Sequence, residues 1–133
     1  MIRDPQPQRV YHLENLRIEK VICGSDQTYC IAQSSERRHV FSWGCNSYAK
    51  LGHSYRKTIT QVSNKSSVQQ EKTPTLIKEL EGAEITDLSC GNSHTFAWSN
   101  QTQLVYGWGN GANGRLGNES DDIVTEPRIL EPF

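Results

Sequence analysis

The chain has 133 residues, of which 35% are hydrophobic and 22% are charged, enough for one small domain. Its 15 acidic and 14 basic residues leave a formal net charge of −1, so no overall field attracts it to nucleic acid, an anionic membrane or a charged substrate. The longest apolar run has four residues, whereas a membrane-spanning helix needs about 20. We expect no membrane partner, and nucleic acid is disfavoured as a partner.

The chain begins Met-Ile-Arg-Asp-Pro-Gln-Pro-Gln, without the apolar stretch of a secretory signal. The four cysteines show neither the dense spacing of a disulfide framework nor a C-x-x-C metal knuckle; they are Cys23, Cys30, Cys45 and Cys90. These features predict a cytoplasmic or nuclear protein with reduced thiols and without a metal ion. A zinc site remains the alternative.

Two segments of the chain recur. Residues 7–32 match 74–99 with seven identities in 26 pairs, and after a loop residues 40–52 match 105–117 with five identities in 13 pairs. A further copy opens at Pro127. The predicted units are a first repeat at 7–73 with a long loop at 53–72, a second repeat at 74–126, and the start of a third repeat at 127–133.

Each copy has the pattern of four short strands. In the second copy these are 76–77, 85–89, 95–99 and 104–108, with turn residues between them. No segment keeps a 3.6-residue apolar period over three turns, which disfavours a helical array. Four strands per repeat of about 50 residues are typical of propeller blades. We therefore predict an all-β fold of two four-stranded antiparallel blades, that is, an incomplete β-propeller.

The matched motifs resemble those of a known family. Residues 90–97, Cys-Gly-Asn-Ser-His-Thr-Phe-Ala, and residues 105–117, Val-Tyr-Gly-Trp-Gly-Asn-Gly-Ala-Asn-Gly-Arg-Leu-Gly, are similar to the repeat of the regulator of chromosome condensation family, the RCC1-type β-propeller. The resemblance covers nearly all of the chain from Pro7 to Pro127. The chain departs from the family pattern at Gln27, Ala49, Gly111, Lys50 and Arg115.

The resemblance implies a scaffold role for the motif residues. Trp43 and Trp108 would pack, Gly44 and Gly109 would allow close approach of two backbone segments, and Leu51 and Leu116 would enter the core. Gly52 and Gly117 are expected in left-handed turns, where glycine lacks the clash of a Cβ atom. Cys23 and Cys90 recur at one repeat position, so we expect both to be buried and apart from each other.

Function on such a scaffold depends on its loops. Asp26 and His94 lie in the turn after Cys-Gly in the two copies, and by resemblance to exchange-factor members these are the candidate partner contacts. The alternative for His94 is a hydrogen bond that stabilises its own turn. The loop 53–72 carries four basic residues and one acid, and it is either a solvated insertion or a binding loop. The basic cluster at 37–39 is expected to be solvated.

One motif indicates chemistry. Gly109, Gly111 and Gly114 form a G-x-G-x-x-G pattern after a predicted strand, but a dinucleotide site needs a helix to begin there. The repeat explains these glycines better. No Ser/His/Asp set, carboxylate pair or metal-ligand set stands out, so we predict no catalytic residue, no cofactor and no enzyme.

Four functions remain open. The favoured one is a non-enzymatic module of RCC1-like repeats that binds a protein partner. The alternatives are a guanine-nucleotide exchange factor for a Ran-like small GTPase, or the repeat module of an E3 ubiquitin ligase; a nucleotide-binding enzyme is the least favoured. Because repeats generally need three or more neighbours for stability, we expect a fragment of a larger propeller or a chain that self-associates.

Overall fold

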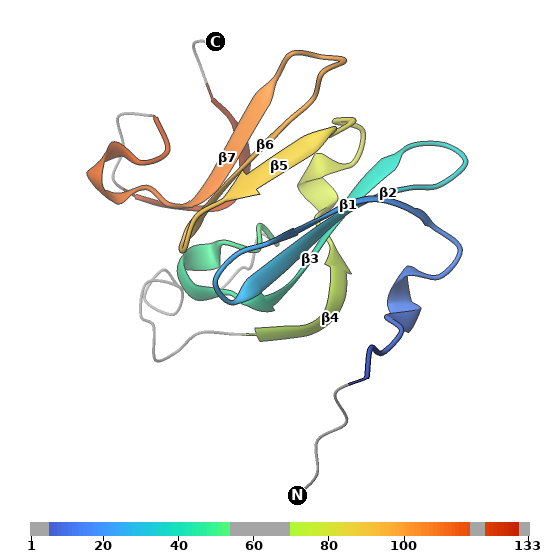
Figure 1. The fold of residues 1–133 in the computed structure, drawn as a ribbon. Coiled ribbons are helices and arrows are strands. Elements are labelled where there is room, and N and C mark those ends of the chain that lie inside the picture. Colours follow the sequence, from blue (N-terminus) through green and yellow to red (C-terminus); the bar gives the residue numbers. More distant parts are fainter. Residues whose placement is uncertain (1–5, 54–69, 118–121, 131–133) are drawn as a thin grey trace, which may run out of the picture.

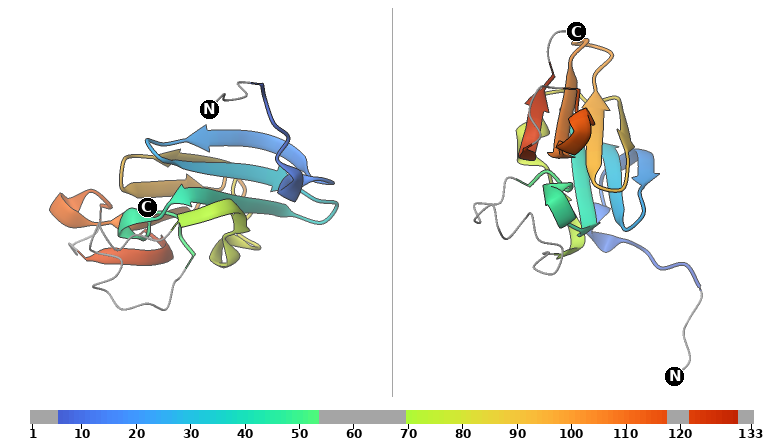
Figure 2. Two further views of the ribbon diagram at one scale, coloured as in Figure 1. Left: turned by 90° about the horizontal axis from the view of Figure 1, so that it is seen from below. Right: turned by 90° about the vertical axis from the view of Figure 1, so that its left-hand side faces the viewer.

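The computed structural model describes residues 6–53, 70–117 and 122–130, and these form two four-stranded sheets that lie face against face (Figure 1, Figure 2). All pairings are antiparallel between strands adjacent in sequence. The first sheet contains β1 (Arg17–Cys23), β2 (Gln27–Gln33), β3 (Arg38–Cys45) and β4 (Gln70–Leu76). The second contains β5 (Asp87–Cys90), β6 (His94–Trp98), β7 (Val105–Asn110) and β8 (Ile123–Ile129). The predicted fold class of two blades is confirmed.

Short 3₁₀ turns connect these strands. They are η1 (Tyr11–Leu13), η2 (Ser47–Ala49), η4 (Lys78–Leu80) and η5 (Ala112–Gly114). In the described parts of the chain, no helix has the length and apolar character needed to cross a bilayer.

One strand differs from the prediction. The segment 76–77 does not open the second sheet, because Leu76 pairs with Phe41 at the end of β4 and the Ile77 amide donates to the Val40 carbonyl at 2.8 Å. The fourth strand of each sheet pairs with the third, and the sequence alone does not show whether residues 76–77 belong to the first sheet or to the second. Of the predicted loop 53–72, residues 54–69 lie outside the described residues, and Gln70 to Lys72 begin β4.

The close approach predicted at the two Trp-Gly motifs is confirmed. A Cβ atom on Gly44 would lie 2.6 Å from the Asp26 carbonyl oxygen, and one on Gly109 would lie 2.5 Å from the Ser93 carbonyl oxygen. Both glycines have positive φ, 111° and 102°. Each motif therefore fastens the third strand of its sheet to the hairpin turn between the first two.

The main core lies between the two sheets. It joins side chains of β2 and β3 to η4, β5, β6 and β7, and its members are Tyr29, Ile31, Val40, Ile77, Leu80, Ala83, Ile85, Leu88, Ala97, Trp108, Leu116 and Val124. Burial of this apolar area is the main force that holds the two blades together. The predicted core positions Leu51, Leu116 and Trp108 are fully buried, whereas Trp43 is only half-buried.

A buried polar contact lies beside this core, at the backbone carbonyl of Lys50. The Tyr29 hydroxyl donates to this carbonyl at 2.5 Å and the indole Nε1 of Trp108 donates at 2.8 Å. The Tyr29 and Thr95 hydroxyls lie 2.7 Å apart. Buried polar atoms cost free energy when they lack partners, so these bonds set the position of one blade on the other.

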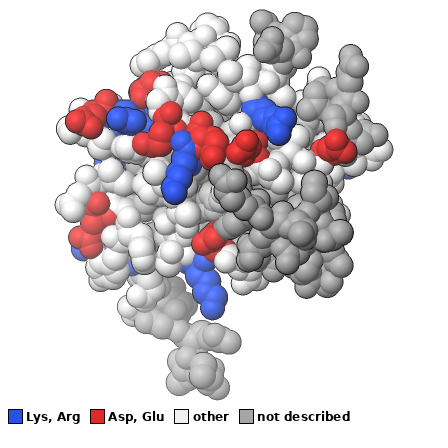
Figure 3. All heavy atoms as spheres, turned by 180° about the vertical axis from the view of Figure 1, so that it is seen from behind, with Lys and Arg blue, Asp and Glu red and all other residues white. Residues whose placement is uncertain are grey.

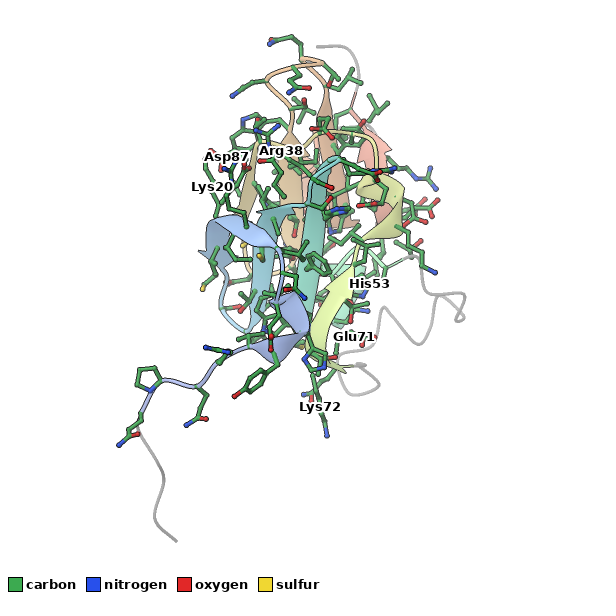
Figure 4. The ribbon with its side chains drawn as sticks, turned by 90° about the vertical axis from the view of Figure 1, so that its right-hand side faces the viewer. Lys20, Arg38, His53, Glu71, Lys72 and Asp87 are labelled. Atoms are coloured by element: carbon green, nitrogen blue, oxygen red, sulfur yellow. The ribbon has the colours of Figure 1, made fainter. Side chains whose placement is uncertain are left out.

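Ion pairs join the blades at their rims. The ion pairs are Lys20–Asp87 at 2.7 Å and Arg38–Glu84 at 3.4 Å, and a hydrogen bond joins His39 to Glu81 at 2.9 Å. Figure 4 shows Lys20, Arg38 and Asp87 on the same side of the two sheets. The expectation that the cluster at 37–39 is only solvated was therefore wrong, because Glu81 and Glu84 of the second repeat bind it.

The prediction that Cys23 and Cys90 are both buried and apart was wrong. Cys23 is exposed because neither described sheet covers the outer side of β1, and Cys90 in β5 is half-buried. Burial raises the pKa of the Cys90 thiol, and the charge of nearby Cys23 raises that pKa further. The buried cysteine is Cys30, whose pKa burial raises to about 11.

Candidate functional site

The two hairpin turns that follow β1 and β5 meet at one end of the sheets and border a polar hollow of about 380 Å³. We call it the hairpin hollow. Its lining residues are Ser25, Asp26, Ser47, Tyr48, Lys50, Asn92, Ser93, Asn110 and Arg115. The close approach of each Trp-Gly motif fixes the turns. The Cys45 amide donates to the Asp26 carbonyl at 2.9 Å, and the Asn110 amide donates to the Ser93 carbonyl at 2.8 Å.

Lys50 links the two turns. Its ammonium donates to the Asp26 carboxylate and, at 2.8 Å, to the Asn92 carbonyl oxygen. Its side chain is 2% exposed while that of Asp26 is 51% exposed. Burial by itself would raise the pKa of Asp26, but the hydrogen bond and charge of Lys50 outweigh it and hold the pKa below 3.8. The pair therefore presents a carboxylate that is ionised at neutral pH at the rim of the hollow.

Arg115 is the counterpart of Lys50 in the second repeat. Its Nη1 donates to the Ser93 hydroxyl at 3.1 Å and its Nε donates to the Ala112 carbonyl at 2.8 Å. The guanidinium thus remains within its own repeat, with further donors available for a ligand. The hollow is therefore lined by the Asp26 carboxylate, the Arg115 guanidinium, and Asn92 and Asn110.

Of the two predicted contacts, only Asp26 is among the residues that line the hairpin hollow. Asp26 lines the hairpin hollow, whereas His94 is the first residue of β6 and packs edge-on against Phe96 with ring centroids 5.8 Å apart. The Nδ1 atom of His94 is buried and has no hydrogen-bond partner among the described residues. The alternative in which a hydrogen bond from its side chain stabilises the turn is therefore not supported.

The glycine-rich motif does not start a helix. Residues 112–114 form the 3₁₀ turn η5, with Asn113 in a left-handed conformation at φ 62°. A phosphate site of the dinucleotide type needs a helix N-terminus at this point. Within the described ranges, no group of three His, Cys, Asp or Glu residues could hold a metal ion.

Sequence reasoning missed the members of the hollow that matter most for its charge. Lys50 and Arg115 occupy the same repeat position, where the family pattern has glutamine, and this repeated basic substitution was the signal that could have found them. Elsewhere the surface is mixed. Figure 3 shows acidic and basic side chains interspersed on the face seen from behind, in keeping with the net charge of −1.

Comparison with known proteins identifies the repeats. The family model for the regulator of chromosome condensation (RCC1) repeat matches residues 39–98. The serine/threonine-protein kinase Nek9 of Xenopus laevis is 33% identical over 95% of this chain, which spans 12% of that protein. The E3 ubiquitin-protein ligase HERC2 of Homo sapiens is 33% identical over 94% of the chain, which spans 2% of it.

A solved structure shows the same fold. Prp20p of Saccharomyces cerevisiae superposes on 90% of this chain with a TM-score of 0.70 and 15% sequence identity, and the chain covers 26% of that protein. The chain thus spans a small part of each protein it matches. Two sheets with equivalent motifs, the repeat match over residues 39–98 and these relatives show that the chain contains RCC1 repeats.

Proposed function

We propose that this chain is a non-enzymatic protein-interaction module that contacts its partner through the hairpin hollow. The observation that carries the proposal is the pairing of the two turns by Lys50, which places an exposed carboxylate beside the Arg115 guanidinium. Charged groups held on a fixed scaffold select a partner without chemistry. The described residues hold two serine–histidine hydrogen bonds, Ser34 to His39 at 2.9 Å and Ser42 to His53 at 2.7 Å, but neither pair lines the hairpin hollow.

Matched arginine substitutions in two hairpin turns of the second sheet test this proposal. Asn92 and Asn100 are both exposed, and they lie in the turns at opposite ends of β6. In cells that express the chain fused to a proximity-labelling enzyme, Asn92→Arg should remove a set of labelled proteins that Asn100→Arg retains. Equal labelling by both variants, with unchanged thermal unfolding, would reject the hollow as the contact surface.

A guanine-nucleotide exchange factor for a Ran-like GTPase is the second candidate. Prp20p is described by its binding properties to Gsp1p and histones, and it shares the fold of this chain. Asp26 and His94 would be the contacts. Because this chain covers 26% of Prp20p, we expect no faster release of fluorescent GDP from Gsp1p. Faster release that is lost on Asp26→Ala or His94→Ala would favour exchange activity.

A role as the repeat module of an E3 ubiquitin ligase follows from the similarity to HERC2. In that setting the hairpin hollow would bind a protein, and the ligation chemistry would belong to other parts of the longer protein. The sequence on either side of this chain in its gene distinguishes this setting from the others, since it shows which domains accompany the repeats. The predicted cytoplasmic or nuclear location fits all three.

A further inference from the structure

The outer side of the first sheet carries an apolar hollow of about 490 Å³. Its apolar lining comes from the segment before β1, from β1 itself and from β3: Val10, Leu13, Leu16, Ile18, Val21 and Trp43. Val10, Ile18 and Val21 are 44%, 41% and 58% exposed. So much exposed apolar area on one face of a small chain marks a contact surface.

The second repeat shows what these residues do when they are covered. In the alignment of the two repeats, five residues of this lining are equivalent to residues of the second repeat: Val10 to Ile77, Leu13 to Leu80, Ile18 to Ile85, Val21 to Leu88 and Trp43 to Trp108. All five counterparts belong to the core between the sheets and are at most 4% exposed. They are buried because the inner face of the first sheet packs on them.

The inner face of the first sheet also has a counterpart. Its contact residues Gln27, Tyr29, Ile31, Lys50 and Gly52 align with His94, Phe96, Trp98, Arg115 and Gly117 on the outer side of the second sheet. All five residues of the first set are buried, while those of the second set are half-buried or exposed. Within the described residues, the outer sides of the two sheets are therefore two unpaired halves of an interface that the sheets already form once.

The equivalent glycines Gly52 and Gly117 differ in what lies beside them. A Cβ atom on Gly52 would lie 2.8 Å from Nε1 of Trp108, whereas one on Gly117 would meet no described atom within 4 Å. Both glycines have φ 76°. The same turn is thus built twice, and only the first copy has an indole against it.

We propose that the apolar hollow of one chain receives the outer face of the second sheet of another copy, head to tail, with Trp43 on Gly117. Trp43 Nε1 would donate to the Arg115 carbonyl as Trp108 Nε1 does to that of Lys50. A heterologous contact of this kind forms rings when its rotation closes. The inference is independent of the proposed function, because it concerns the two outer faces rather than the hairpin hollow.

The charges at the rim agree in part with the proposed contact between two copies. Lys20 pairs with its own repeat counterpart, Asp87, so a docked copy would place Asp87 beside another Lys20. The other two rim pairs are not reproduced, since Arg38 and Glu84 align with Gln103 and Arg17, and His39 and Glu81 align with Leu104 and Glu14. We expect the contact between copies to be weaker than the contact within a chain.

Sedimentation velocity of the full chain over about a hundredfold range of concentration is the first test. The wild type should associate as concentration rises. Val21→Glu places a charge in the hollow and should weaken association at least tenfold. Tyr11→Glu is the control, because Tyr11 is 65% exposed and its counterpart Lys78 is exposed as well. A monomeric wild type, or equal association of both variants, would overturn the proposal.

A mixing experiment tests the head-to-tail arrangement. Trp98→Glu alters the other half of the interface, and Leu104→Glu, at a 36% exposed site on the same side, serves if the first variant fails to fold. Each variant alone should be monomeric, while an equimolar mixture with Val21→Glu should form a 1:1 dimer, since each partner supplies one intact half. A mixture of the two variants that remains monomeric would contradict self-assembly. The same holds if the chain associates only with a different RCC1-repeat protein and not with a second copy of itself.

Discussion

The two sheets repeat one motif set in two environments. Trp108 lies on Gly52 in the core between the sheets, while Trp43 lines the apolar hollow on the outer side of the first sheet. The two indoles occupy the same position of a Val-x-x-Trp-Gly motif, so their difference in burial comes chiefly from the neighbouring sheet. A motif residue of a propeller blade is thus only half of a contact, and the next blade supplies the other half.

The largest test of this comparison truncates the two indoles. Trp108→Ala should lower the free energy of unfolding by about 3–5 kcal/mol, because it leaves a cavity and removes the donor to the Lys50 carbonyl. Trp43→Ala should cost about 1 kcal/mol. Urea unfolding at low protein concentration measures both. Similar losses would mean that the two indoles are equally covered in solution.

The next test places alanine at the two equivalent glycines. Gly52→Ala should cost about 3 kcal/mol, since it adds the strain of positive φ to a clash with the Trp108 indole, whereas Gly117→Ala should cost about 1 kcal/mol from φ alone. Thermal unfolding of both variants decides the point. If Gly117→Ala were the more damaging change, the open space beside Gly117 would be filled in solution.

A third test uses pH. Burial, and then the charge of Arg115, holds the pKa of His94 below 6.5, and burial lowers the pKa of His53 as well. The unfolded chain therefore binds protons first, so stability is complete above pH 6.5 and falls as the pH decreases below it. His94→Gln introduces the residue that the first repeat has at the equivalent position, Gln27. This variant should lose less stability as the pH decreases.

The exposed residue His12 provides the control for this measurement, because His12→Gln removes a histidine from a solvated turn. Chemical denaturation at several pH values gives the free energy of unfolding as a function of pH, and the slope of this dependence should be unchanged in His12→Gln. If the free energy of unfolding of His94→Gln varied with pH as that of the wild type does, His94 would not contribute to the pH dependence of stability.

The smallest expected effect is at the rim. Lys20 and Asp87 are both well exposed, so Lys20→Ala should cost about 0.5 kcal/mol and less in high salt. The hydrogen bond from Lys20 lowers the pKa of Asp87 most, so this contribution should be complete above pH 3.8 and should be lost as the pH falls through the lowered pKa of the folded state. Asp87→Asn gives the matched measurement, and a loss that is insensitive to salt would point to packing by the Lys20 stem instead.

The repeated glycines, tryptophans and leucines of the sequence were enough to predict two antiparallel blades, the left-handed turns at Gly52 and Gly117 and the close approach at Gly44 and Gly109. These features are local, because they depend on backbone conformation and on pairing within one sheet. Burial was different. Cys23 and Cys90 share a motif but not an environment, and the link from Lys50 to Asp26 and Asn92 joins positions far apart in the chain. Only the packing of one sheet on the other decides such contacts, since it sets which copy of each repeated side chain has a neighbour.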